Sequence, residues 1–154
     1  MTIITRELVR LNAQATGKED AIKQAGALLV ENGRVTTAYV DGMLAREQTM
    51  STYLGNGIAI PHGQFDNRAD IFATGISVVQ FPAGIEWEDG ELAYLVIGIA
   101  ATADEHIGVL ANLSQVIEEE ADAQQLIHAA DPMLIVERLG RPAEVEEEST
   151  VQAS

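Results

Sequence analysis

Apolar residues early in the chain recur at intervals of three and four, the spacing of one face of an α-helix. This spacing predicts a helix over residues 17–32, which the capping box Thr16-Gly17-Lys18-Glu19 would begin and Asn32-Gly33 would end. A second helix is predicted from Thr36 or Thr37 to Glu47. The apolar residues that define the two helices are Ala21, Ile22, Ala25, Leu28 and Leu29, then Tyr39, Val40, Met43 and Leu44.

Continuous apolar runs in the middle of the chain predict β-strands. Residues 58–60 form a short run and residues 71–81 a longer, largely buried one, which Pro82-Ala83-Gly84 would end as a turn. The run over residues 92–101 is rich in Val and Ile and suits a strand buried on both faces. We expect it to be the central strand of a sheet.

Two further helices are predicted after this strand. Thr102-Ala103-Asp104-Glu105 forms a second capping box, which places His106 in or beside the first turn of a helix. Asp131-Pro132 opens a last helix through Leu139. Alternating strands and helices predict a single α/β domain over residues 1–140, with a central mixed β-sheet flanked by helices and polar residues at the strand exits. Residues 141–154 are predicted to be an acidic, disordered tail.

Composition narrows the classes of function. The chain has 154 residues, 24 Asp and Glu against 9 Lys and Arg, and a formal net charge of -15. The negative electrostatic field of such a chain repels the phosphate backbone of nucleic acids, so we expect no nucleic-acid partner. The same charge could speed encounter with a basic protein or simply maintain solubility. No cysteine is present, which excludes disulfides and thiolate chemistry. Neither a signal peptide nor a membrane-spanning stretch is visible, so a cytoplasmic protein without direct membrane insertion is expected.

His62 is the main candidate for chemistry. It follows the predicted strand 58–60 and lies between Pro61, which cannot donate to a sheet, and Gly63, which lets the backbone turn or a ligand approach. A neutral imidazole in such a place could be a nucleophile, a base or a metal ligand. His106 also lies at a strand exit, although spacing alone does not show that the two histidines meet.

Four blocks in order resemble the mannitol/fructose-type enzyme IIA domain of the bacterial phosphoenolpyruvate-dependent sugar phosphotransferase system, and the mannitol branch in particular. The resemblance covers roughly residues 8–140. The blocks are Leu11-Asn12-Ala13-Gln14-Ala15-Thr16, Met43-Leu44-Ala45-Arg46-Glu47, Thr52 to Gly63 including Pro61-His62-Gly63, and Leu95 to Ala101 leading into Glu105-His106-Ile107.

The resemblance implies a phosphotransferase component that acts as a phosphocarrier. The resemblance implies that His62 accepts a phosphoryl group from HPr and passes it to a cysteine of a IIB domain. That IIB domain would belong to a permease with a membrane IIC component, which takes up mannitol or a related sugar. Arg46 and His106 line the same site, and Glu47 is a possible supporting residue. No cofactor and no metal are implied.

These residue types suit phosphoryl relay. The transferred group carries negative charge on three equatorial oxygens, so the protein must mainly position and neutralise it. Neutral His62 would attack, through Nε2 by resemblance, while its other ring nitrogen donates to an acceptor that the sequence does not identify. Arg46 offers parallel N–H donors for the oxygens, and His106 at a helix start could donate with help from the helix dipole.

Plainer interpretations remain open. His62 could be an ordinary loop histidine, His106 could interact only locally, and Arg46 could serve only the helix dipole or pair with Glu47. His128 is most simply a surface or packing residue, and no role is assigned to Trp87. One functional alternative is a regulatory IIA-like protein that acts through phosphorylation-dependent protein contacts. Another is a metal-dependent enzyme that uses His62, His106 and a carboxylate.

Overall fold

The computed structural model describes residues 3–102 and 106–140, except for the side chains of Phe65, Asp66, Arg68, His106 and Ile107. The predicted acidic tail over residues 141–154 and most of the second capping box therefore lie outside the described residues. The elements are η1 (Arg6–Leu8), β1 (Val9–Arg10), α1 (Lys18–Glu31), α2 (Thr37–Thr49), β2 (Tyr53–Gly55), β3 (Ile58–Ala59), η2 (Phe65–Asp70), β4 (Gly75–Glu88), β5 (Glu91–Ala100), α3 (His106–Glu118), α4 (Glu120–Ile127) and α5 (Pro132–Leu139).

The strands of the described chain form one mixed five-stranded sheet in the order β1-β4-β5-β3-β2. β4 and β5 are antiparallel and long, whereas β3 runs parallel to β5 through the pairs Ile58–Leu95 and Ala59–Val96. The predicted central strand is confirmed, because β5 occupies the middle of the sheet. From Ala93 to Ala100 only Tyr94 is not fully buried.

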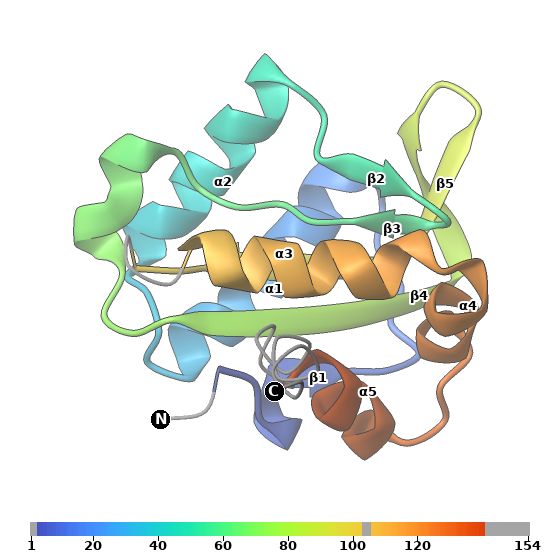
Figure 1. The fold of residues 1–154 in the computed structure, drawn as a ribbon. Helices are drawn as coiled ribbons and strands as arrows, with labels where there is room; N and C mark the ends of the chain where they lie inside the picture. The colour runs from blue at the N-terminus through green and yellow to red at the C-terminus, as the bar shows by residue number, and fades with distance from the viewer. Residues whose placement is uncertain (1–2, 103–105, 141–154) are drawn as a thin grey trace.

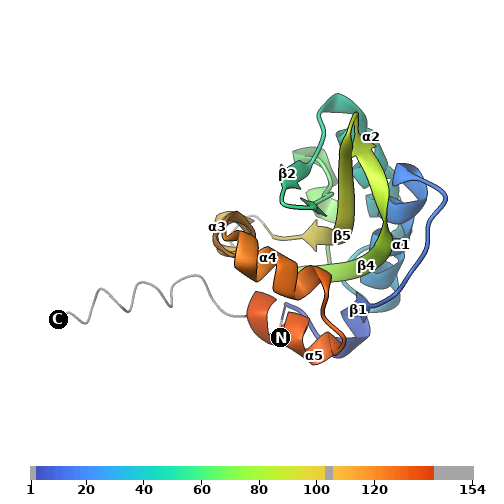
Figure 2. The ribbon, with the colours of Figure 1, turned by 90° about the vertical axis from the view of Figure 1, so that its right-hand side faces the viewer.

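Helices cover both faces of the sheet (Figures 1 and 2). α1 and α2 pack on one side, and α3, α4 and α5 lie on the other. The predicted single α/β domain with a central mixed sheet is thus confirmed. α1 approaches the sheet closely, since the Ser77 hydroxyl donates to the Ala25 carbonyl over 2.8 Å and a Cβ on Gly98 would lie 3.2 Å from the Ala25 methyl. No helix in the described ranges is long and apolar enough to cross a membrane.

The predicted turn at Pro82-Ala83-Gly84 is wrong. β4 continues through these residues, and its pairing with β5 is interrupted after Gln80 and resumes at Ile85. Pro82 lacks an N–H and Gly84 has φ +82°, so this stretch forms an irregularity within the strand and not a chain reversal. The chain turns back instead at Asp89–Gly90.

Two of the helix caps differ from the sequence prediction. Gly17 occupies the N-cap of α1, and the Thr16 N–H donates to the Asp20 carboxylate over 3.0 Å, so the reciprocal box with Glu19 is wrong. Thr36 occupies the N-cap of α2, but its buried hydroxyl makes no hydrogen bond within the described structure. The Asp131 cap of α5 is confirmed by its hydrogen bond from the Met133 N–H at 3.0 Å.

Candidate functional site

His62 lies beyond β3, beside the end of β5. It forms an isolated parallel bridge with Ile99, and the Ile99 N–H donates to the Pro61 carbonyl over 3.0 Å. Because β3 and β5 are parallel, both reach the same edge of the sheet at their carboxyl ends, where ligands of α/β sheets usually bind. The imidazole is half-buried there.

A backbone carbonyl fixes the tautomer of His62. Its Nδ1 lies 2.9 Å from the oxygen of Ile60. A carbonyl oxygen can only accept a hydrogen bond, so Nδ1 must carry the proton in this contact. In the neutral ring the lone pair then resides on Nε2, the nitrogen that the resemblance assigns to attack. Ile60 is the acceptor that the sequence did not identify.

Tyr39 of α2 supports the residue after the histidine. Its hydroxyl accepts a hydrogen bond from the Gly63 N–H at 2.9 Å and donates one to the Ile99 carbonyl at 2.8 Å. The ring is only 3% exposed, and burial raises the pKa of Tyr39, although the Gly63 hydrogen bond lowers it in part. The hydroxyl therefore stays protonated at neutral pH and can both donate and accept.

Close approach of α2 requires small residues around His62. A Cβ on Gly63 would lie 2.6 Å from Tyr39 Cε1, and one on Gly42 would lie 2.2 Å from Asn67 Oδ1. That same Asn67 oxygen accepts from the Gln64 N–H at 2.8 Å, which ties the segment after His62 to α2. Glycines at both positions let the helix and this segment pack directly against each other.

Arg46 lies in the last turn of α2, as predicted, and is half-buried. Its Nη1 donates to the carbonyl of Met50, the C-cap residue of α2, over 2.7 Å. The guanidinium therefore supplies a hydrogen-bond donor to a carbonyl at the end of its own helix. This contact agrees with the plainer interpretation of a cation at a helix C-terminus. One hydrogen bond leaves further guanidinium N–H groups for an anion.

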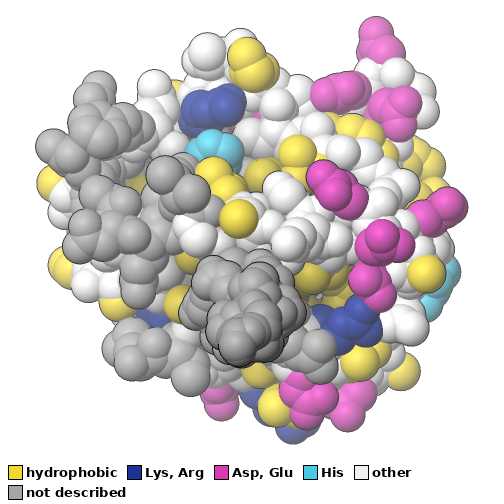
Figure 3. Space-filling model, viewed as in Figure 1, with side chains coloured by type: hydrophobic (Ala, Val, Ile, Leu, Met, Phe, Trp, Pro, Cys, Tyr) yellow, Lys and Arg dark blue, Asp and Glu magenta, His cyan; other side chains and the backbone are white. Residues whose placement is uncertain are grey.

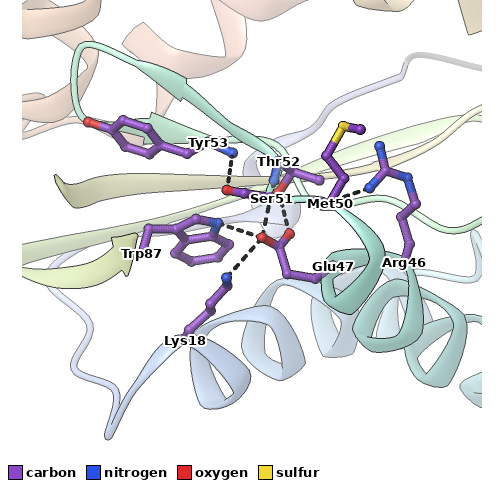
Figure 4. A network of polar contacts seen from close by, with 8 residues as sticks. All are labelled: Lys18, Arg46, Glu47, Met50, Ser51, Thr52, Tyr53 and Trp87. Atoms are coloured by element: carbon purple, nitrogen blue, oxygen red, sulfur yellow. Dashed lines mark hydrogen bonds and ion pairs between the residues drawn. The ribbon is translucent and has the colours of Figure 1, made fainter. Parts of the chain in front are cut away.

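Glu47 is buried and points away from Arg46, toward α1 and β4 (Figure 4). Its Oε2 accepts from the Thr52 N–H at 3.1 Å and from Trp87 Nε1 at 2.9 Å, and its Oε1 accepts from the Thr52 hydroxyl at 2.6 Å. Lys18 Nζ forms an ion pair with Oε2 at 3.1 Å and lies 5.5 Å from the centre of the Trp87 ring. Glu47 is therefore a structural acceptor that joins three separate segments.

The Glu47 contacts reach the histidine through the backbone. The Ile60 N–H donates to the Thr52 carbonyl over 3.0 Å, and the Ile60 carbonyl is the partner of His62 Nδ1. Glu47 thus holds Thr52 in place, and Thr52 in turn holds Ile60 at the end of the strand that precedes His62. The pair interpretation of Arg46 with Glu47 is wrong, because the Glu47 carboxylate takes its hydrogen bonds and ion pair from other residues.

His106 is the first residue of α3, which confirms its predicted place at the helix start. Its side chain lies outside the described residues, so its role stays a prediction. His128 follows α4, is exposed, and its Nε2 lies 3.1 Å from Gln124 Oε1. Among the described residues there is no group of three or more His, Cys, Asp or Glu side chains that could hold a metal ion.

In Figure 3 a histidine side chain in the upper left part of the molecule lies beside a basic side chain, with apolar side chains next to them. Acidic side chains gather elsewhere on this face, toward the β4–β5 hairpin and α4. The hairpin carries the exposed residues Glu86, Glu88, Asp89 and Glu91. On this face the acidic side chains therefore gather near the hairpin and α4 and not beside the basic side chain next to the histidine.

Tyr39 and Trp87 are the residues that sequence analysis missed. From the sequence, Tyr39 is treated only as part of the apolar face of its helix, and Trp87 has no assigned role. A signal existed for both, because a buried Tyr hydroxyl or Trp N–H usually has a hydrogen-bond partner. The sequence does not show which partner, since Gly63 and Glu47 are distant along the chain.

Comparison with known proteins gives one consistent result. Residues 2–141 match the family described as "Phosphoenolpyruvate-dependent sugar phosphotransferase system, EIIA 2". The chain is 41% identical over 129 residues to the mannitol-specific phosphotransferase enzyme IIA component of Bacillus subtilis, covering 84% of this chain and 90% of that protein. It is 54% identical over 113 residues to the multiphosphoryl transfer protein of Salmonella typhimurium, covering 73% of this chain but only 30% of that protein.

A solved structure shows the same fold. The complex of enzyme IIA-Mtl and phosphorylated enzyme IIB-Mtl from Escherichia coli contains a chain that superposes with a TM-score of 0.81 and 38% identity. The match covers 88% of this chain and 96% of that one. The resemblance seen in four short blocks of sequence therefore extends over nearly the whole described domain.

Proposed function

The chain belongs to the EIIA type 2 family of the phosphoenolpyruvate-dependent sugar phosphotransferase system, as a mannitol-type phosphocarrier, and we propose that His62 carries its phosphoryl group. One observation carries the proposal. The Nδ1–H of His62 is held by the Ile60 carbonyl, which leaves the lone pair on Nε2 at the sheet edge. A neutral imidazole in this tautomer can attack phosphorus without first losing a proton.

The relay has two steps that balance without a cofactor. In the first, Nε2 bonds to phosphorus as the bond between phosphorus and the donor atom of HPr breaks. In the second, a cysteine thiolate of a IIB domain attacks phosphorus and the nitrogen–phosphorus bond breaks, which returns a neutral His62. The proton stays on Nδ1, which donates it in a hydrogen bond to the Ile60 carbonyl, in both steps, so no base is needed.

Arg46 would neutralise the transferred group. Both steps pass through a loose arrangement with charge on the equatorial oxygens, and a guanidinium offers paired donors to such oxygens. Arg46 is placed by the last turn of α2 and by its bond to the Met50 carbonyl. Glu47 supports the site indirectly through Thr52, and His106 would add a donor from the start of α3.

The partners are proteins. The solved relative is bound to phosphorylated IIB-Mtl, and we assign this chain a IIB domain of a IIC-containing permease as acceptor, with mannitol or a related sugar as cargo. HPr is the donor that the family implies, and the relay would operate in the cytoplasm. Met50, whose carbonyl accepts from Arg46, is 65% exposed and offers an apolar contact next to Arg46. The net charge of -15 favours a partner with a basic face.

Labelling tests the assignment of His62. Phosphorylated HPr is incubated with the wild-type chain, with His62→Ala and with the control His128→Ala, which removes an exposed histidine elsewhere. We expect an acid-labile, base-stable phosphoprotein from the wild type and from the control, and none from His62→Ala. Unchanged labelling of His62→Ala refutes the site. Onward transfer to a purified mannitol-type IIB then separates a relay protein from one that is phosphorylated only as a signal.

A further inference from the structure

We infer that Tyr39 is a positioning residue for His62, acting through the backbone on both sides of the reacting ring. The inference deepens the proposed function and depends on it for its kinetic part. Tyr39 Oη is the only described hydrogen-bond partner of the Gly63 N–H, and it also bonds the Ile99 carbonyl. Ile99 is the residue that pairs with His62 across the sheet.

Hydrogen bonds fix both peptide planes that flank His62. The plane before it is held by the bond from the Ile99 N–H to the Pro61 carbonyl, at 3.0 Å. The plane after it is held by the bond from the Gly63 N–H to Tyr39, at 2.9 Å. Together the two planes set the direction of the Cα–Cβ bond of His62. This direction decides whether the ring can reach back to the Ile60 carbonyl.

The Tyr39 bond has no ready substitute. The ring is 3% exposed and Gly63 is in contact with it, so another side chain has no room to replace the hydroxyl. Removal of the hydroxyl would leave the Gly63 N–H and the Ile99 carbonyl without their partner. The peptide after His62 would then rotate more freely, and the bond between Nδ1 and the Ile60 carbonyl would lose its fixed geometry.

The consequence is a change in where the ring proton resides. With the Ile60 bond intact, Nδ1 is protonated and Nε2 is ready to attack. With the bond weakened, the tautomer that carries the proton on Nε2 becomes populated, and it cannot attack through that atom. Tyr39 therefore controls the fraction of protein in the reactive form as well as the direction of the ring.

Tyr53 provides a matched control. Its hydroxyl accepts from the Gly57 N–H at 3.1 Å and donates to the Leu92 carbonyl at 3.3 Å. A Tyr53→Phe substitution thus removes the same atom and the same two kinds of backbone bond as Tyr39→Phe. Tyr53 lies in β2, and its partner Gly57 lies at the entry of β3 and not at the exit where His62 follows.

The experiment compares Tyr39→Phe, Tyr53→Phe and the wild type by ¹⁵N spectra of the histidine rings and by the rate of phosphorylation from HPr. Urea unfolding of each variant verifies that it is folded. We expect the wild type and Tyr53→Phe to show His62 protonated at Nδ1 and to be labelled at equal rates. Tyr39→Phe should populate the Nε2–H tautomer and be labelled about tenfold more slowly, the scale of losing the one hydrogen bond that holds the peptide after His62.

Two outcomes overturn the inference. In the first, Tyr39→Phe has the same ring spectrum and phosphorylation rate as the wild type. In the second, Tyr39→Phe and Tyr53→Phe are phosphorylated equally more slowly than the wild type. The ring spectra need no phosphoryl donor. If the wild type were not labelled on His62 while the spectra still differed as expected, the proposed function would fail and the positioning role would stand.

Discussion

Replacement of Glu47 by alanine is expected to lower the free energy of unfolding by about 4 kcal/mol, whereas glutamine should cost only about 1 kcal/mol. The contrast follows from the geometry of the buried carboxylate. Alanine leaves the Thr52 N–H and Trp87 Nε1–H buried without an acceptor, at about 1–3 kcal/mol each, and removes packed atoms as well.

Glutamine can preserve most of the contacts. Its oxygen in the place of Oε2 still accepts from Thr52 and Trp87, and its amide nitrogen in the place of Oε1 can donate to the Thr52 hydroxyl, which can also accept. Only the charge is lost. The Lys18 side chain is 30% exposed and can turn to solvent, so the loss of its ion pair costs little.

Urea unfolding measured by tryptophan fluorescence is the assay, because Trp87 is the only tryptophan of the chain and belongs to this network. The control is Lys18→Met, which removes the ion pair and leaves the three hydrogen bonds; we expect it to cost about 1 kcal/mol or less. Thermal unfolding should move by about 8–16 °C for Glu47→Ala. If alanine and glutamine destabilise the protein equally, the buried donors do not depend on Glu47 and the reasoning is wrong.

Three further results are expected. Arg46→Gln should slow transfer to and from His62 about a hundredfold, the scale of one lost donor to the transition state, and Arg46→Lys should recover little; a lysine variant at the wild-type rate would contradict this. Because burial raises the pKa of Tyr39, its stabilising contribution is complete below about pH 10 and is lost as pH rises through the folded pKa, so the alkaline decline in stability should be smaller in Tyr39→Phe. Asp131→Ala should lower the free energy of unfolding by about 1 kcal/mol through loss of the α5 cap, without affecting phosphorylation; slowed labelling would show that α5 influences the site.

Local patterns predicted the parts of the fold that depend on local physics. The continuous apolar run over residues 92–101 identified the middle strand because only a strand covered on both faces can be apolar at every position. The Asp131-Pro132 cap was equally visible, since its partner is two residues away. The Pro82 turn was wrong because pairing with β5 resumes beyond the proline, and no local signal shows that a distant strand will be present.

The candidate site divides in the same way. His62 was visible from its neighbours Pro61 and Gly63, which act within the same segment. The residues that support it were not visible, because they are distant in sequence. Tyr39 is 24 positions from its hydrogen-bond partner Gly63 and 60 positions from its other partner, Ile99. Glu47 and Trp87 are 40 positions apart. Such contacts arise only when α2 packs on the sheet, so a sequence pattern indicates that partners exist without naming them.

The helix α2 carries Tyr39, Arg46 and Glu47, so their relative directions are set by its winding alone. Insertion of one residue between Tyr39 and Arg46 would rotate everything beyond it by about 100° and shift it by about 1.5 Å. The guanidinium and the buried carboxylate would then face the wrong neighbours together. Length changes in natural or engineered variants should accordingly be tolerated at the Asp89–Gly90 hairpin tip and be absent from the stretch between Tyr39 and Glu47.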